Sequence, residues 1–109
     1  MSGFVQIVTT VETAADARRI ATALLEQRLA ACVQIVGPIT SHYWWQGKME
    51  QASEYQCLIK SRQDLFAAVE AAIVAIHPYQ TPEILALPVV AGGSGYLAWL
   101  HAELRPETP

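Results

Sequence analysis

The stretch His77-Pro78-Tyr79-Gln80-Thr81-Pro82-Glu83 divides a helical pattern from a strand pattern, and so it decides how the second half of the chain folds. A proline disfavours the helical region for the residue before it, so Pro78 should end the preceding helix at His77 and Pro82 should keep Thr81 extended. An imidazole, a phenol, an amide, a hydroxyl and a carboxylate then share one loop. We interpret this loop as a candidate functional site, against the alternative of a proline-stiffened connection with incidental polar residues.

Regular patterns flank this loop on both sides. Before it, apolar residues recur at helical spacing and predict a helix from about Arg62 to Ile76. After it, a continuous apolar run predicts a strand from Glu83 to Val90, with a carboxylate at its start. The glycine-rich segment 92–95 lacks the lysine and the spacing of a phosphate-binding loop. Its Ser94 is instead placed to cap a short helix from Tyr96 to Leu104.

The N-terminal segment predicts a strand followed by a helix. The run from Phe4 to Thr9 is rich in aromatic and β-branched residues, which is typical of a buried strand. Thr13 and Asp16 then form a pattern that resembles a capping box, with Asp in place of the usual Glu. This pattern predicts the start of a helix that continues to about Gln27.

A long β-hairpin should follow. The first arm runs from near Ala31 to Trp45, and Gly37-Pro38 within it predicts a bend, a bulge or an edge position. Gly47 suits a tight turn, because glycine readily adopts a positive φ, and the second arm returns from Lys48 to Lys60. Both arms are long for ordinary strands, so the hairpin should overhang a small domain and its aromatic tip should need a cover.

The order of these elements is β-α-β-β-α-β with an added C-terminal helix. This order predicts an α+β fold of the ferredoxin-like, split βαβ type, with two helices on one face of an antiparallel sheet. The sequence shows no linker, low-complexity segment or internal repeat. We therefore expect residues 1–109 to form a single domain.

The composition narrows the class of protein. Of the 109 residues, 52% are hydrophobic and only 16% are charged, so we expect some apolar surface to face another subunit. The net charge is −3 with no basic cluster, which argues against nucleic-acid binding. No apolar run has the length of a membrane span, and the N-terminus lacks the features of a secretion signal, so we expect a cytoplasmic protein. Cys32 and Cys57 are interpreted as small buried side chains in a reducing compartment.

Catalytic and metal-binding patterns are weak. No nucleophile elbow occurs, and the three histidines are far apart in the sequence, with no paired spacing of ligands, so we expect no enzyme. Lys60 ends an apolar strand, where it is either an edge lysine or a pocket cation. Glu83 could pair with it. Trp44 and Trp45 favour packing or a subunit interface over a ligand platform.

Together these residues resemble the CutA divalent-cation-tolerance family. The resemblance rests on Ala30-Ala31-Cys32, Tyr43-Trp44-Trp45-x-Gly47-Lys48, Lys60, His77-Pro78-Tyr79-x-x-Pro82-Glu83 and Tyr96-Leu97-x-Trp99, in this order over almost the whole chain. It implies a ferredoxin-like subunit in a tight homotrimer, with the long hairpins packing across neighbouring subunits. It also implies an architecture similar to nitrogen-regulatory signalling trimers, which bind ligands between subunits.

The resemblance also bears on ligands. Copper ligation proposed for some members uses a cysteine at the end of the first strand and a His-His pair, where this chain has Thr9 and Ile76-His77. Only His77 remains as a metal-ligand candidate. The polar positions shared by the family map to Lys60, Tyr79 and Glu83, with Trp45 nearby, and imply a ligand pocket near a subunit boundary.

We therefore expect a homotrimer that binds a small molecule or an ion such as copper or another divalent cation. A signalling or scaffold trimer that acts through a protein partner is the alternative, and an enzyme is the third interpretation. The acid–base pair Lys60 and Glu83 has no nucleophile or cofactor motif beside it, so catalysis has the least support.

Overall fold

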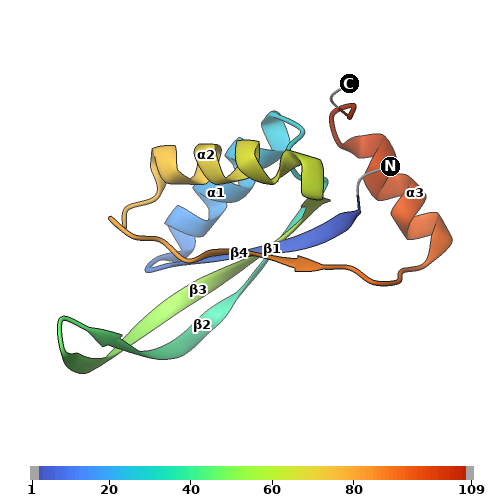
Figure 1. Cartoon of the computed structure of the whole chain (residues 1–109). Coiled ribbons are helices and arrows are strands. Elements are labelled where there is room, and N and C mark those ends of the chain that lie inside the picture. The colour runs from blue at the N-terminus through green and yellow to red at the C-terminus, as the bar shows by residue number, and fades with distance from the viewer. Residues whose placement is uncertain (1–2, 108–109) are drawn as a thin grey trace.

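The computed structural model describes residues 3–107 as one four-stranded antiparallel sheet with helices on one face (Figure 1). The spatial order of the strands is β2-β3-β1-β4, which is the order of a split βαβ fold. The predicted ferredoxin-like α+β class is thus confirmed. The elements are β1 (Phe4–Val11), α1 (Ala14–Glu26), β2 (Cys32–Trp45), β3 (Lys48–Arg62), the 3-10 turn η1 (Gln63–Leu65), α2 (Phe66–Ile76), β4 (Ile84–Pro88) and α3 (Ser94–Glu103).

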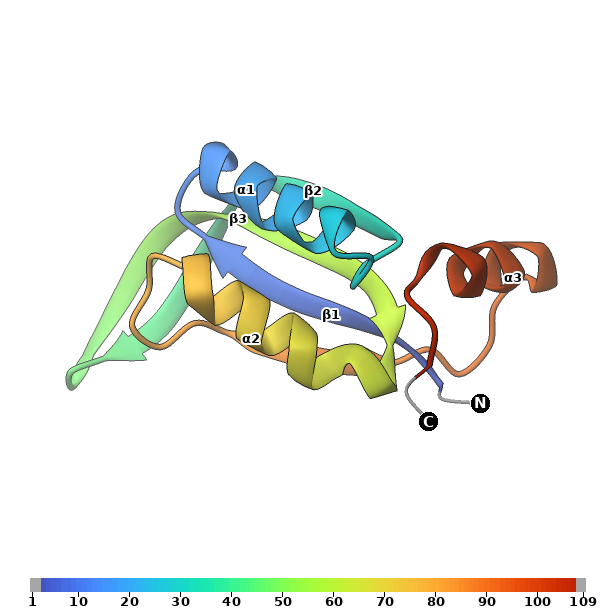
Figure 2. The same ribbon diagram turned by 90° about the horizontal axis from the view of Figure 1, so that it is seen from above.

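Helices α1 and α2 lie side by side over the same face of the sheet, and α3 lies apart from them near the N-terminal end of β1 (Figure 2). Side chains alternate between the two faces of a strand, so every second residue of β1 and of the inner part of β3, from Tyr55 onwards, points beneath α1 and α2. Among residues 3–107, no helix lies on the opposite face of the sheet (Figures 1 and 2).

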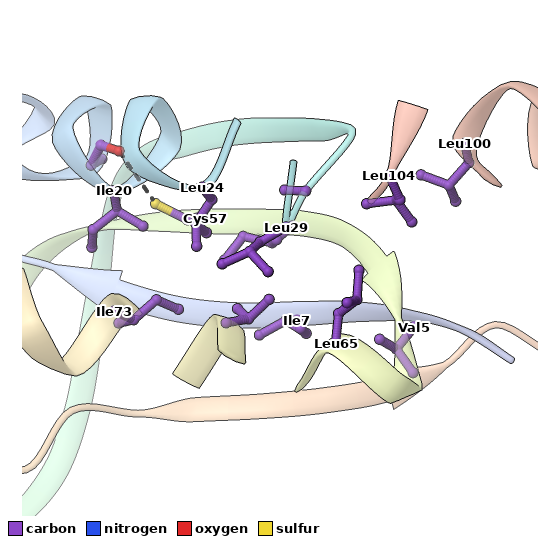
Figure 3. Packing of buried hydrophobic residues seen from close by; sticks show 14 of the residues in the cluster. Val5, Ile7, Ile20, Leu24, Leu29, Cys57, Leu65, Ile73, Leu100 and Leu104 are labelled. Carbon is purple, nitrogen blue, oxygen red and sulfur yellow. Dashed lines mark hydrogen bonds between the residues drawn. The ribbon is translucent and has the colours of Figure 1, made fainter. Parts of the chain in front are cut away.

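The core lies between this sheet face and the helices (Figure 3). Ile7 and Ile59 from the two central strands meet Ile20 and Leu24 from α1 and Ile73 from α2, and all five are at most 1% exposed. Each such side chain contributes about 1.5–3 kcal/mol when it leaves water. The core therefore fixes the spacing of the two helices on the sheet, and with it the position of the loop that follows α2.

Local signals set the start of α1. Thr13 has extended backbone angles, and its hydroxyl accepts a hydrogen bond from the Asp16 N–H at 3.1 Å. Such a cap satisfies one of the free N–H groups in the first turn of a helix. The predicted capping interaction between Thr13 and Asp16 is confirmed.

The β2–β3 hairpin extends well beyond the body of the domain (Figure 1). Gln46 and Gly47 form its turn with φ values of 51° and 79°, and positive φ at both central residues is the requirement of a type I′ turn. Between Val36 and Ile39 the pairing register shifts, because Gly37 and Pro38 on β2 lie opposite the single residue Tyr55 on β3. The predicted interruption is a β-bulge on an edge strand, and bulges increase local twist.

Several predicted boundaries were wrong. Strand β3 continues to Arg62, and α2 begins only at Phe66 after the η1 turn, because the Arg62 side chain is buried and forms an ion pair with Asp64 inside that turn. Strand β4 spans Ile84–Pro88 and so excludes Glu83 and the two residues after Pro88. Ser94 is the first residue of α3 and not its cap, since Gly93 occupies the capping position.

The C-terminal segment is attached to the end of β3 through Arg62. This side chain is fully buried, and its Nη2 donates a hydrogen bond to the Arg105 carbonyl at 2.7 Å. Leu100 and Leu104 add apolar contacts to the main core (Figure 3). Helix α3 is therefore packed against the main core and the end of β3, and a single domain over residues 1–109 stays a prediction.

Candidate functional site

A pocket of about 540 Å³ opens where the hairpin leaves the body of the domain. Thr10 near the end of β1 and Glu54 of β3 line one part of it. Tyr43 and Trp45 line another part, together with Ser41 and His42 from the same stretch of β2. The loop between α2 and β4 supplies the remaining wall through residues 79–81 and 83. The volume is in the range of small-molecule pockets in proteins.

His77 anchors the α2–β4 loop to the sheet. It has extended backbone angles (φ −70°, ψ 133°) and ends α2, as the following proline predicts. Its Nε2 lies 2.9 Å from the Thr10 carbonyl, and its Nδ1 accepts the Tyr79 N–H at 3.0 Å. Because Nδ1 is the acceptor, Nε2 carries the proton and donates to the carbonyl. One buried imidazole thus joins the loop to β1 through Nε2 and holds the loop backbone at Tyr79 through Nδ1.

Tyr79 and Glu54 form the central polar contact of the pocket. The Tyr79 hydroxyl donates a hydrogen bond to Glu54 Oε2 at 2.8 Å. Burial raises the pKa of Tyr79 well above its ordinary value, and the hydrogen bond to Glu54 and its negative charge raise the pKa further. The phenol therefore stays protonated at neutral pH and remains a donor to the carboxylate.

The pocket has acidic and aromatic walls. Glu54 and Glu83 both line it, and neither forms a salt bridge within residues 3–107. No lysine or arginine is among the lining residues of this part of the chain. A site with this lining favours ligands that carry positive charge and exposes them to aromatic faces.

The structure brings together three of the four residues predicted for the ligand site. Tyr79, Glu83 and Trp45 all line the pocket. Lys60 does not, because it lies on the same strand as Glu54 but six residues further along, which is about 20 Å in a β-strand. Its Nζ donates a hydrogen bond to the Gln6 side chain on the neighbouring strand. Within one subunit, therefore, Lys60 does not form a cluster with Tyr79 and Glu83.

Sequence reasoning missed Glu54, Thr10 and Tyr43 as pocket residues. Glu54 is only 7% exposed, although it lies on a hairpin strand with exposed neighbours. Strand alternation places it on the same face as Lys60, and this was the signal available in the sequence. Alternation does not reveal that the α2–β4 loop folds back over this position.

The positions associated with copper in the family do not fit a copper site in this chain. Thr9 is fully buried on the helix-covered face of the sheet and offers no thiolate. Both nitrogens of His77 are engaged in hydrogen bonds, so ligation by His77 requires at least one of these bonds to break. Among residues 3–107, no three His, Cys, Asp or Glu side chains are grouped as metal ligands.

Both cysteines have free thiols. Cys57 is completely buried beneath α1, where its thiol lies 3.9 Å from the Ala17 carbonyl (Figure 3). Burial raises the pKa of the Cys57 thiol to about 11, so it stays protonated at neutral pH. Cys32 is half-buried at the start of β2. The interpretation of Cys57 as a small apolar core residue agrees with this geometry.

The fold and the pocket define a class: small ferredoxin-like α+β domains with an overhanging hairpin and a pocket at its base. Within that class, residues 5–103 match the family described as CutA1 divalent ion tolerance protein. A protein from Pectobacterium atrosepticum named divalent-cation tolerance protein CutA is 50% identical over 101 residues, which are 93% of this chain and 92% of that protein. The chain belongs to the CutA1 divalent ion tolerance family.

Solved structures support the same assignment. The divalent cation tolerance protein of Thermus thermophilus is 42% identical, with a TM-score of 0.90 over 93% of this chain and 98% of that one. CutA1 from Oryza sativa is 36% identical, with a TM-score of 0.92 over 95% of each chain. The family is named for cation tolerance and not for a catalytic activity.

No helix within residues 3–107 combines the length and the apolar character of a membrane span. A relative from Archaeoglobus fulgidus, 41% identical with a TM-score of 0.89 over 92% of this chain and 97% of that one, is described as a periplasmic divalent cation tolerance protein. A cytoplasmic location for this chain stays a prediction.

Proposed function

We propose that this protein is a non-catalytic homotrimer that binds a small molecule or a divalent cation in the pocket at the base of its hairpin. The observation that carries this function is the pocket itself, where the hydrogen-bonded pair Tyr79 and Glu54 meets Trp45 and Glu83. It has the size of a ligand site, and its lining combines aromatic side chains with polar and acidic ones. A cytoplasmic location is part of the same proposal, because both thiols are free.

The uncovered face of the sheet supports assembly. Leu85 and Leu87 of β4 lie on this face at 57% and 47% exposure, beside Val8 and Leu58 of the central strands. Strand β4 is also a sheet edge, whose unpaired backbone groups favour a cover. A symmetric trimer would bury this apolar face and the aromatic hairpin tips against neighbouring subunits.

Assembly is tested by light scattering of the purified protein at low micromolar concentration. We expect the mass of three chains of 11.9 kDa each. The variant Leu85→Lys should shift the mass towards the monomer, because it places a charge on the uncovered face. Val74→Lys is the matched control, since Val74 has a similar exposure of 55% but lies on α2. A monomeric natural protein would contradict the trimer, and equal behaviour of the two variants would contradict the uncovered face as its interface.

Ligand binding is tested by thermal stability, because a ligand that binds the native state raises the apparent melting temperature. Salts of Cu²⁺, Zn²⁺, Ni²⁺, Mg²⁺ and Ca²⁺ and a panel of small metabolites would be screened against the natural protein, Glu54→Gln and the control Glu70→Gln. Glu70 is exposed on α2, away from the pocket. Stabilisation that is lost only in Glu54→Gln supports the pocket, whereas equal stabilisation of all three proteins places binding elsewhere.

Weak copper binding at a single histidine is expected in that screen, because Cu²⁺ has the highest affinity among these metals for almost any nitrogen site. Exposed His42 is a candidate for such binding. A tight stoichiometric copper site that disappears in His77→Ala would instead identify His77 as a copper ligand, as proposed for the family.

A further inference from the structure

The size of the pocket and its donor groups distinguish between a small molecule and a divalent cation as the ligand. At about 540 Å³ the pocket is many times larger than a dehydrated metal ion. Transition metals in proteins are usually held by three or four side-chain ligands, and residues 3–107 contain no group of three such side chains. The geometry therefore favours a molecule over a bare ion.

The charge of the pocket favours a cationic molecule. A carboxylate has about four acceptor positions on its two oxygens, and Glu54 uses one of them for the Tyr79 hydroxyl. Glu54 is 7% exposed, and within the described residues no lysine or arginine pairs with it. A buried charge without a counter-charge is costly, so a cation in the pocket would gain a partner that the subunit does not supply.

The aromatic side chains add a second preference. Tyr43 and Trp45 are two residues apart on β2, so both project from the same face of the hairpin. The register pairs Tyr43 with Glu50 and Ile39 with Glu54, which places Glu54 on that same face. An ammonium group placed between the carboxylate and these rings would satisfy both, since aromatic faces attract cations.

We propose that the pocket binds a small organic cation, with its ammonium group held by Glu54 and Glu83 and its apolar substituents against Tyr43 and Trp45. This inference rests on the proposed function in one respect, namely that this pocket is the ligand site. It goes further by naming the chemical class of the ligand. The shared chemistry is the positively charged nitrogen, which both quaternary ammonium compounds and protonated amines carry.

The test compares choline with its neutral carbon isostere, in which a tert-butyl group replaces the trimethylammonium group. Putrescine provides a protonated amine. Binding is followed by NMR of the tryptophan indole N–H signals, which distinguish Trp45 from Trp44 and Trp99. We expect choline or putrescine to shift the Trp45 signal and to bind at least about tenfold more tightly than the isostere, because only a charged nitrogen interacts with the carboxylates.

Matched variants locate the site. Glu54→Gln should weaken binding of the cation about tenfold or more while leaving the affinity for the isostere unchanged, because it removes the charge and keeps the shape. Trp45→Leu should weaken it about fivefold. Glu70→Gln and Trp99→Leu are the controls, since both residues lie outside the pocket, and neither should change the affinity.

The outcomes distinguish this inference from the proposed function. Equal affinity for choline, putrescine and the isostere, or an unchanged affinity in Glu54→Gln, would overturn the organic-cation assignment. If divalent salts stabilise the natural protein but not Glu54→Gln, while neither organic cation binds, the inference is wrong and the proposed function stands. If no probe binds in the pocket at all, both are wrong.

Discussion

Replacing His77 by alanine should lower the free energy of unfolding by about 2–4 kcal/mol, without any metal present. The reason lies in the edge of the sheet. Pairing between β1 and β4 ends at Thr9 and Ile84, so the Thr10 carbonyl has no β4 partner beyond that point. The His77 Nε2–H takes the place of the missing strand and satisfies this carbonyl at 2.9 Å.

The magnitude follows from the two bonds that the imidazole makes. Removal of the Nε2–H leaves the buried Thr10 carbonyl unsatisfied, which costs about 1–3 kcal/mol. Loss of the bond from the Tyr79 N–H adds about 1 kcal/mol. His77→Gln retains a donor and an acceptor, so it should lose less stability than His77→Ala.

The assay is guanidinium unfolding in the presence of a chelator, at one fixed chain concentration because oligomerisation contributes to apparent stability. His42→Ala is the control, since His42 is exposed on the hairpin and its loss should stay within about 0.5 kcal/mol. The structural role of His77 would be refuted by a loss as small as that of His42→Ala. A loss that appears only after copper is added would instead identify His77 as a metal ligand.

Three further predictions concern other parts of the structure. Burial raises the pKa of Cys57 from 9.0 to about 11, so its contribution to stability is complete below pH 9 and falls as pH rises through 11. The unfolding free energy of Cys57→Ala should therefore depend less on pH across this window than that of the natural protein. The same dependence on pH in both proteins would contradict this prediction. Gly37→Ala should destabilise the hairpin by about 1–3 kcal/mol in thermal unfolding, because a Cβ at this position lies 2.6 Å from a Tyr55 ring carbon and 3.1 Å from backbone atoms of Glu54 and Tyr55. An unchanged melting temperature would show that the Tyr55 ring moves away freely. Arg62→Met should lower the free energy of unfolding by about 3 kcal/mol and speed amide hydrogen exchange around Arg105, because it removes the ion pair with Asp64 and the hydrogen bond to the Arg105 carbonyl. Unchanged hydrogen exchange around Arg105 would show that Arg62 does not attach the C-terminal segment to β3.

Local chemistry in the sequence was sufficient for the order and type of the elements. Thr13 and Asp16 determine where α1 begins, Pro78 determines where α2 ends, and the turn at Gly47 joins two strands whose register the turn then sets. These signals act between residues close in the chain, so they can be read without the fold. The motifs from Tyr43 to Glu83 were equally informative about the family, because they are sequence features themselves.

The start of α2 and the composition of the pocket required the tertiary structure. The helical spacing of apolar residues predicts that α2 starts near Arg62. Burial of the Arg62 guanidinium beside Asp64 instead extends β3 to Arg62, so α2 begins at Phe66. Lys60 and Glu54 lie on one face of one strand, and alternation cannot tell which of them meets the α2–β4 loop. The packing of α2 on the sheet decides this, because it places the Tyr79 hydroxyl at Glu54 and leaves Lys60 about 20 Å away along the strand.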